Sequence, residues 1–193
     1  MPLLVLLHGY GADENDLFGL VPCLPDGIVT ASVAAPLSPP WPMPGRSWYP
    51  IEGLDGRDPA DVTAAAQALL RWLDRTAADA PSVALLGFSQ GAAVALQALR
   101  IAPDRIGAVI ALSGYVAPGA MPLDDRLAET PPPVFWGRGT HDDVIPAHLV
   151  AHTAQWLPGH ADLSGRVYAG LTHSISEQEL DDVRRFLDRW LGA

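Results

Sequence analysis

The sequence predicts a doubly wound α/β domain on a mostly parallel sheet of about six strands. Short runs of aliphatic residues alternate along the chain with longer segments in which apolar residues recur every three to four positions. The runs are apolar on both faces, which is typical of parallel strands covered by helices on both sides. Two Pro-rich loops also follow predicted strand ends, where open sheets of this class bind ligands.

The predicted elements span the chain, and residues 1–193 are expected to form one domain. The strands are expected at Leu3–Leu7, Ile28–Ala35, Val83–Phe88, Ile106–Ser113, Pro133–Gly137 and Arg166–Ala169. The helices are expected at Pro59–Asp79, Gln90–Ile101, Ala147–Leu157 and about Glu177–Leu191. Asp58 suits the N-cap of the first helix, and Ser176 with Glu179 predicts a capping box at the last.

Composition limits the classes of partner. A formal net charge of −10 disfavours binding to a nucleic-acid backbone or to an anionic membrane surface. The chain has no evident metal-ligand motif, and we expect no metal and no cofactor. It also has no apolar run long enough to span a membrane. The one cysteine, Cys23, excludes an intrachain disulfide and is expected to be a buried thiol. Since the N-terminus does not resemble a signal peptide, we expect a cytoplasmic location.

The most informative motif is Gly87-Phe88-Ser89-Gln90-Gly91, a G-x-S-x-G pattern. It follows a predicted strand and opens a predicted helix, which is the strand–turn–helix setting of a nucleophile elbow. The glycines on each side allow the helix to pack closely against the strand. Ser89 is therefore the candidate nucleophile of a serine hydrolase.

A serine hydroxyl needs a base, and among six histidines His173 is the best candidate. It follows the last predicted strand and is the final histidine in the chain, as the order serine, acid, histidine requires. His8, at the end of the first strand, is interpreted as a residue that braces its loop rather than as the base.

The base in turn needs a carboxylate to orient its ring. The segment Gly139-Thr140-His141-Asp142-Asp143-Val144-Ile145-Pro146 follows a predicted strand between the serine and the histidine. Asp142 and Asp143 are both suitable, and their spacing from the other residues does not distinguish them.

The oxyanion of the reaction needs two N–H donors. One is the backbone N–H of Gln90, directly after the nucleophile, and the other is that of Tyr10 in His8-Gly9-Tyr10-Gly11. Each such donor contributes about a hundred- to a thousandfold in rate.

These motifs, together with Leu112-Ser113-Gly114 and Tyr168-Ala169-Gly170-Leu171-Thr172-His173-Ser174, resemble in sequence and order the phospholipase/carboxylesterase family of α/β hydrolases. The resemblance implies a minimal α/β-hydrolase fold without a cap domain. It assigns the catalytic acid to Asp142 and leaves Asp143 where many members have proline. It also implies an acyl pocket near Val144 and Ile145, with the loop that carries Trp48 and Tyr49 beside the site.

The chain departs from the family in two ways. It starts almost at the first parallel strand, so the usual N-terminal antiparallel strands are expected to be missing, which would leave an exposed sheet edge that allows a homodimer. The loops are also compact and carry no lid insertion.

We therefore expect a carboxylic ester hydrolase that acts on small or medium acyl esters through an acyl-enzyme. The alternatives are a lysophospholipase or acyl-protein thioesterase and, from another class, a catalytically silent binding module of the same fold.

Overall fold

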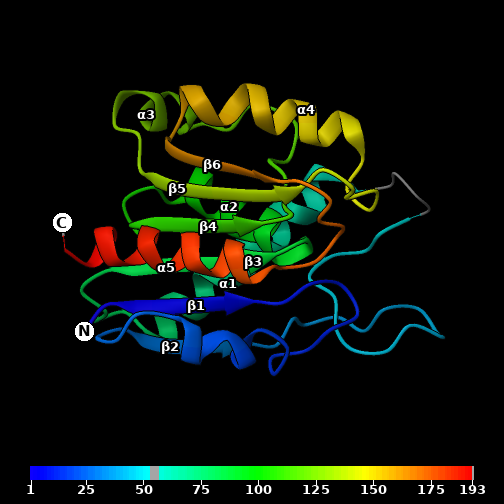
Figure 1. The fold of residues 1–193 in the computed structure, drawn as a ribbon, viewed down its shortest axis with the longest axis horizontal. Coiled ribbons are helices and arrows are strands. Elements are labelled where there is room, and N and C mark those ends of the chain that lie inside the picture. The colour runs from blue at the N-terminus through cyan, green and yellow to red at the C-terminus, as the bar shows by residue number, and fades with distance from the viewer. Residues whose placement is uncertain (53–56, 193) are drawn as a thin grey trace.

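A six-stranded parallel sheet organises the residues that the computed structural model describes, which are 1–52 and 57–192 (Figure 1). The strands are β1 (Leu3–Leu7), β2 (Val29–Val33), β3 (Val83–Phe88), β4 (Ala108–Leu112), β5 (Pro133–Gly139) and β6 (Asp162–Tyr168). Their order is β2-β1-β3-β4-β5-β6, and every pairing is parallel. The order reverses between β1 and β3, so the loops that follow these two strands diverge and open a crevice between them.

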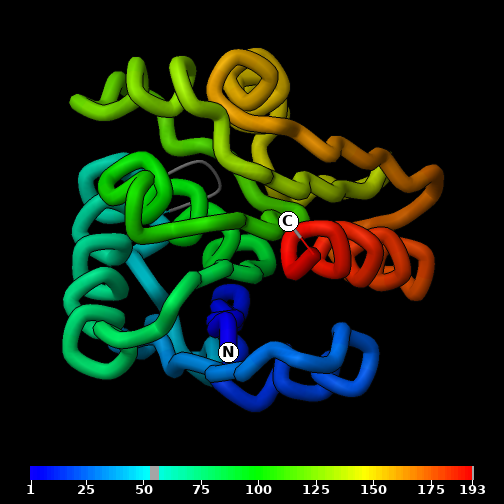
Figure 2. The backbone as a smooth tube through the Cα atoms, turned by 90° about the vertical axis from the view of Figure 1, so that its left-hand side faces the viewer, coloured from blue at the N-terminus to red at the C-terminus, as the bar shows by residue number. Residues whose placement is uncertain are grey.

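Helices cover both faces of the sheet (Figure 2). Helices α1 (Pro59–Thr76), α2 (Gln90–Ile101), α3 (Asp124–Glu129) and α4 (Ala147–Trp156), followed by the short 3-10 helix η2 (Leu157–Gly159), contribute to one apolar cluster. Helix α5 (Glu177–Leu191) and the 3-10 helix η1 (Leu17–Cys23) contribute to the cluster on the other face. Strand β1 supplies both clusters, because Val5 points to one and Leu4 and Leu6 to the other. The predicted fold class is confirmed, and the sheet is parallel throughout.

The main differences from the predicted elements lie at the edges and in the loops. Strand β6 starts at Asp162 rather than Arg166, because an edge strand exposes polar side chains and so lacks a continuous apolar run. Helix α3 lies within Val116–Pro133, the second of the two Pro-rich loops predicted from the sequence, and helix α1 ends at Thr76, three residues earlier than predicted.

Side-chain capping explains where two helices begin. Asp58 accepts a hydrogen bond from the N–H of Ala60 at 2.8 Å, and the Ser176 hydroxyl accepts one from the N–H of Glu179 at 3.1 Å. The predicted capping box is only half formed, since the Glu179 carboxyl makes no return hydrogen bond. The prediction for Cys23 is wrong: its side chain is exposed at the end of η1.

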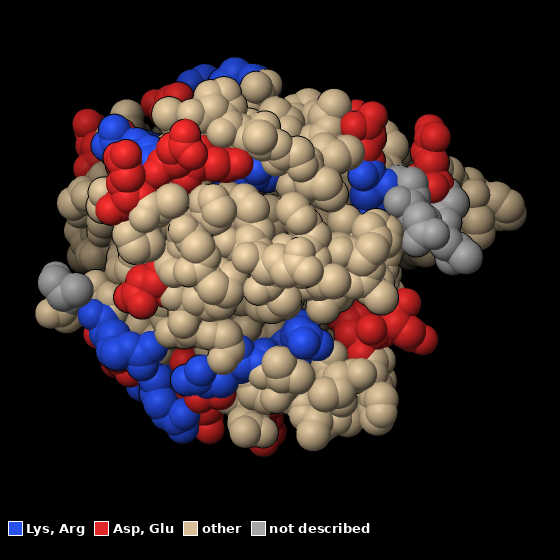
Figure 3. Space-filling view, turned by 90° about the horizontal axis from the view of Figure 1, so that it is seen from above, with Lys and Arg blue, Asp and Glu red and all other residues tan. Residues whose placement is uncertain are grey.

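The surface that carries α4 has a largely uncharged middle, with acidic and basic side chains around it (Figure 3). Helix α4 itself contains no Asp, Glu, Lys or Arg, which agrees with this view. Within the described residues, no helix combines the length and the apolar character that crossing a bilayer requires.

Candidate active site

Ser89 lies in the sharp turn between β3 and α2, at the crevice beside β1. Its φ of 54° falls in the left-handed region, which is strained for a residue with a side chain. A Cβ on Gly87 would lie 2.4 Å from backbone atoms of Gly91, and a Cβ on Gly91 would lie 2.0 Å from the carbonyl oxygen of Leu7. Both positions therefore require glycine so that α2 can start directly against β1 and β3.

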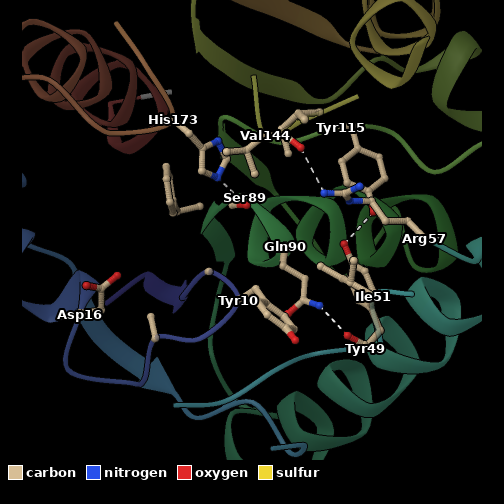
Figure 4. Close-up of a pocket in the computed structure, with 14 residues that line it drawn as sticks. Tyr10, Asp16, Tyr49, Ile51, Arg57, Ser89, Gln90, Tyr115, Val144 and His173 are labelled. Carbon is tan, nitrogen blue, oxygen red and sulfur yellow. Dashed lines mark hydrogen bonds between the residues drawn. The ribbon is translucent and has the colours of Figure 1, made fainter. Parts of the chain in front are cut away.

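The structure brings the three predicted catalytic side chains into one hydrogen-bonded row, of which Figure 4 shows the Ser89 and His173 side chains. His173 Nε2 lies 2.8 Å from Ser89 Oγ, and His173 Nδ1 lies 2.8 Å from Asp142 Oδ2. Because an ionised carboxylate only accepts hydrogen bonds, Nδ1 carries the proton. Nε2 is then the acceptor for the Ser89 hydroxyl, which is the arrangement of a general base.

Asp142 is held by more than the histidine. Its Oδ1 accepts the backbone N–H groups of Val144 at 3.0 Å and Ile145 at 3.3 Å. Burial by itself would raise the pKa of Asp142, but the hydrogen bond and charge of His173 and the two amides together lower it. Asp143, the alternative acid, is exposed to solvent, and the carboxylate hydrogen-bonded to His173 is that of Asp142.

His8 braces the loop after β1. It is fully buried, with Nδ1 at 2.7 Å from the carbonyl oxygen of Gly9, while Nε2 accepts the N–H of Ala35 at 3.1 Å. Since Nε2 is an acceptor, Nδ1 carries the proton and donates it to Gly9. Both ring nitrogens are thus engaged in structural hydrogen bonds away from Ser89.

The predicted oxyanion donors come from the two segments that follow β1 and β3. Tyr10 belongs to the loop after β1, and Gln90 is the first residue of α2. Both line the cavity at Ser89, and neither backbone N–H donates a hydrogen bond to another residue that the structure describes. Two N–H groups next to the nucleophile are therefore available to an oxygen atom of a substrate.

A cavity of about 200 Å³ opens beside Ser89. Figure 4 shows Tyr10 and Asp16 on one side of Ser89, with Tyr115 and Arg57 on the other. The residues that line this cavity come from six segments of the chain: Gly9, Tyr10, Ala12, Asp16, Tyr49, Ile51, Arg57, Phe88, Ser89, Gln90, Tyr115, Val144, Ile145 and His173. The predicted pocket residues Tyr49, Val144 and Ile145 belong to this set.

Trp48 has a different position from the one predicted. Its indole is buried, donates its N–H to the carbonyl oxygen of His8 at 2.9 Å, and does not belong to the cavity lining. Trp48 therefore supports the loop after β1 through this hydrogen bond.

Sequence reasoning missed several residues that line the cavity. The Phe88 ring lies 4.9 Å from the His173 ring, and Arg57 donates a hydrogen bond to the carbonyl oxygen of Val144 at 3.2 Å. The hydroxyls of Tyr49 and Tyr115 lie 2.7 Å apart, and burial raises the pKa of Tyr115 to about 12, so both are neutral at physiological pH. For Phe88 and Tyr115 a signal existed, because each lies in or next to a recognised motif.

A second buried carboxyl follows His173 closely in the sequence. Glu179 is fully buried near the start of α5, and neither carboxyl oxygen has a hydrogen-bond partner among the described residues. Burial raises the pKa of Glu179 to about 7, with the nearby N–H of Ser176 opposing this shift and the charge of Asp182 adding to it. The described residues contain no group of three side chains able to hold a metal ion.

Comparisons with known proteins show the family of the chain. A family model described as phospholipase/carboxylesterase matches residues 1–191. The chain is 33% identical over 111 residues to acyl-protein thioesterase 1 of Saccharomyces cerevisiae, which covers 55% of this chain and 49% of that protein. It is 28% identical over 189 residues to esterase YpfH of Escherichia coli, which covers 92% of this chain and 78% of that protein.

The fold is also found in solved structures. The carboxylesterase of Bacillus cereus superposes with a TM-score of 0.85 at 20% identity, covering 98% of this chain and 88% of that chain. At this level of identity the likeness shows a common fold alone. The chain spans about half the length of the acyl-protein thioesterases that it matches.

Proposed function

This chain belongs to the phospholipase/carboxylesterase family, and we propose that it is a serine hydrolase that cleaves carboxylic esters through an acyl-enzyme. The observation that carries the proposal is the row of Ser89, His173 and Asp142, joined by two contacts of 2.8 Å. Such a row can activate a serine hydroxyl, which is a weak nucleophile when it has no adjacent base.

In the first half of the reaction, Ser89 Oγ attacks the ester carbonyl carbon while His173 Nε2 accepts the hydroxyl proton. The carbonyl oxygen becomes an oxyanion and receives hydrogen bonds from the backbone N–H groups of Tyr10 and Gln90. The bond to the leaving oxygen then breaks, and His173 returns its proton to the departing alcohol.

In the second half, water attacks the acyl-enzyme and loses its proton to His173 Nε2. The tetrahedral intermediate collapses, the bond to Ser89 Oγ breaks, and the serine regains a proton from His173 as the acid departs. Asp142 stays ionised throughout and stabilises the imidazolium, in agreement with its lowered pKa.

The cavity supports small or medium acyl groups as substrates. Its volume of about 200 Å³ is modest, and two hydrogen-bonded tyrosines form part of its wall. No cofactor or metal enters the proposed chemistry.

An acyl-protein thioesterase or lysophospholipase activity is the second candidate, favoured by the relatives that carry the name acyl-protein thioesterase 1. The proposed machinery suits a thioester equally well, because a thiolate is a better leaving group than an alkoxide. The two candidates differ in the length of the acyl chain and in the leaving group.

A panel of ester and thioester substrates with acyl chains of two to sixteen carbons distinguishes these candidates. We expect kcat/KM to peak at short or medium chains, and Ser89→Ala to lower kcat by about 10⁴-fold or more. A peak at long-chain thioesters would favour the second candidate. Failure of the wild type both to hydrolyse the panel and to react with a fluorophosphonate at Ser89 would favour a silent binding module.

A further inference from the structure

The segment 45–49 is bonded directly to the loop that carries the Tyr10 amide. Gly11 donates its N–H to the carbonyl oxygen of Arg46 at 2.9 Å, and Arg46 donates its own N–H to the carbonyl oxygen of Ala12 at 2.8 Å. A Cβ on Gly45 would lie 2.2 Å from the carbonyl oxygen of Gly11, so the two backbones touch. Segment 45–49 therefore fixes the position of the loop after β1.

The side chain of Gln90 is hydrogen-bonded to the same segment. Its Oε1 accepts the backbone N–H of Trp48 at 2.8 Å, and its Nε2 donates to the carbonyl oxygen of Tyr49 at 2.6 Å. Nε2 also donates to the Ser47 hydroxyl at 3.2 Å, and that hydroxyl donates to the carbonyl oxygen of Tyr49 at 2.6 Å. Figure 4 shows the Gln90 side chain directed toward Tyr49.

This contact is specific to a primary amide. Gln90 is 1% exposed, and both its oxygen and its nitrogen have partners, so burial leaves no unsatisfied group on it. Turning the amide round would set its NH₂ against the N–H of Trp48 and its oxygen against the carbonyl of Tyr49. The partners therefore dictate its orientation.

We infer that Gln90 is a positioning residue whose side chain, through segment 45–49, holds the loop after β1 in a fixed position relative to the start of α2. The inference rests on the proposed function, since it presumes that the Tyr10 and Gln90 amides bind the oxyanion. Gln90 donates one of these amides from its backbone while its side chain holds the segment to which the loop of the other is bonded.

The substitution that tests this is Gln90→Met, which keeps the length of the side chain and removes every hydrogen bond to segment 45–49. The backbone N–H of residue 90 is retained. We expect kcat to fall by about 10²-fold, because displacing a catalytic group by about 1 Å has an effect of that size. KM is expected to change less than about threefold, since a loss confined to the transition state leaves ground-state binding intact.

The affinity for a transition-state analogue provides a second measurement, which would not change if Gln90 only stabilised the fold. Phenylboronic acid forms a tetrahedral adduct with an active serine, and one of its oxygens occupies the oxyanion hole. We expect its affinity for Gln90→Met to fall by about the same factor as kcat, while the affinity for a product carboxylic acid changes little.

The matched control is Gln97→Met, on the same helix α2. Gln97 is also buried and hydrogen-bonded, to Thr63 at 2.9 Å and Arg100 at 3.2 Å, but it lies outside the cavity lining. We expect this variant to lose stability while it keeps the kcat and the boronate affinity of the wild type. Equal falls in both variants would overturn the inference, because they would reflect general loosening of α2.

Ser47→Ala provides a second test if Gln90→Met fails to fold. It removes one hydroxyl from the hydrogen bonds between Gln90 and segment 45–49, so we expect kcat and boronate affinity to fall together by a smaller factor. Wild-type kcat and boronate affinity in a folded Gln90→Met or in Ser47→Ala would overturn the inference and leave the proposed function standing. A wild type that neither hydrolyses esters nor binds the boronate would overturn both.

Discussion

Two carboxyl groups with buried side chains, Asp142 and Glu179, differ in almost every respect except burial. Asp142, in the loop after β5, has a 6% exposed side chain and accepts hydrogen bonds from His173, Val144 and Ile145. Glu179, near the start of α5, is fully buried and has no hydrogen-bond partner among the described residues. The pKa of Asp142 is lowered, whereas that of Glu179 is raised to about 7. Burial penalises both charges, and only the donors around Asp142 outweigh it.

The two groups consequently affect stability in opposite directions as pH changes. The contribution from Asp142 is present above its ordinary pKa and is lost as pH falls through its lowered folded value. The contribution from Glu179 is present below its ordinary value of 4.5 and is lost as pH rises through about 7.

The largest test of this comparison is Asp142→Asn. An amide cannot stabilise the imidazolium and favours the wrong tautomer of His173, so we expect kcat to fall by about 10⁴-fold. The control is Asp143→Asn, next in the chain and exposed, which should keep wild-type kcat. The reverse pattern in ester-hydrolysis assays would transfer the role of the acid to Asp143.

The next largest effect is expected from Glu179→Gln. Glutamine cannot ionise, so near pH 4.5 the variant should match the wild type, and near pH 8 it should be more stable by up to about 3 kcal/mol. Urea unfolding at the two pH values measures this difference. Glu177→Gln, two residues earlier and exposed, should show no such pH-dependent gain. A constant difference for Glu179→Gln across this range would mean that Glu179 has an ordinary pKa.

A smaller effect tests the packing around Glu179. A Cβ on Gly137 would lie 2.0 Å from Glu179 Oε1 and 3.0 Å from the Phe135 ring, so Gly137→Ala should destabilise the protein by about 1–3 kcal/mol. Gly165→Ala on the neighbouring strand β6 is the control, because its nearest neighbours lie at 3.8 Å. Comparable melting temperatures for Gly137→Ala and the wild type would indicate that the carboxyl is not packed against β5.

The smallest effect is expected at an exposed carboxyl. Asp104 is paired with Arg126, and their side chains are 74% and 55% exposed. Since solvent screens such pairs, Asp104→Asn should change the free energy of unfolding by less than about 0.5 kcal/mol, and less again in high salt. A loss above about 1 kcal/mol in chemical denaturation would show that exposure is a poor guide to the role of a carboxyl here.

Much of the fold was predictable because its signals are local. Runs such as Leu3–Leu7 and Val83–Phe88 are apolar on both faces and match β1 and β3 residue for residue. Asp58 and Ser176 mark the starts of α1 and α5 through hydrogen bonds within a single turn. The polar edge strand β6 and the short helix α3 were not fully recognised, because tertiary packing stabilises them without a strong local pattern.

The candidate site was predictable in its parts and not in its arrangement. The pentapeptide around Ser89 and the order of its companions indicated the chemistry, while the choice of Asp142 over Asp143 came from family resemblance. The hydrogen bond from Trp48 to the loop after β1, and the contribution of Tyr115 and Arg57 to the cavity, depend on segments far apart in sequence. Single-sequence patterns do not report such contacts.

The sequence by itself determined the class of sheet, the elbow at Ser89 and the set of residues that could serve it, since each follows from short-range periodicity, glycine sterics or motif order. Only the tertiary structure decided which groups meet. It brought residues 89, 142 and 173 into one row, bonded Gln90 to segment 45–49, and buried Glu179 without a partner. Hydrogen bonding and desolvation act over a few ångströms of space, and the topology of the sheet sets those distances.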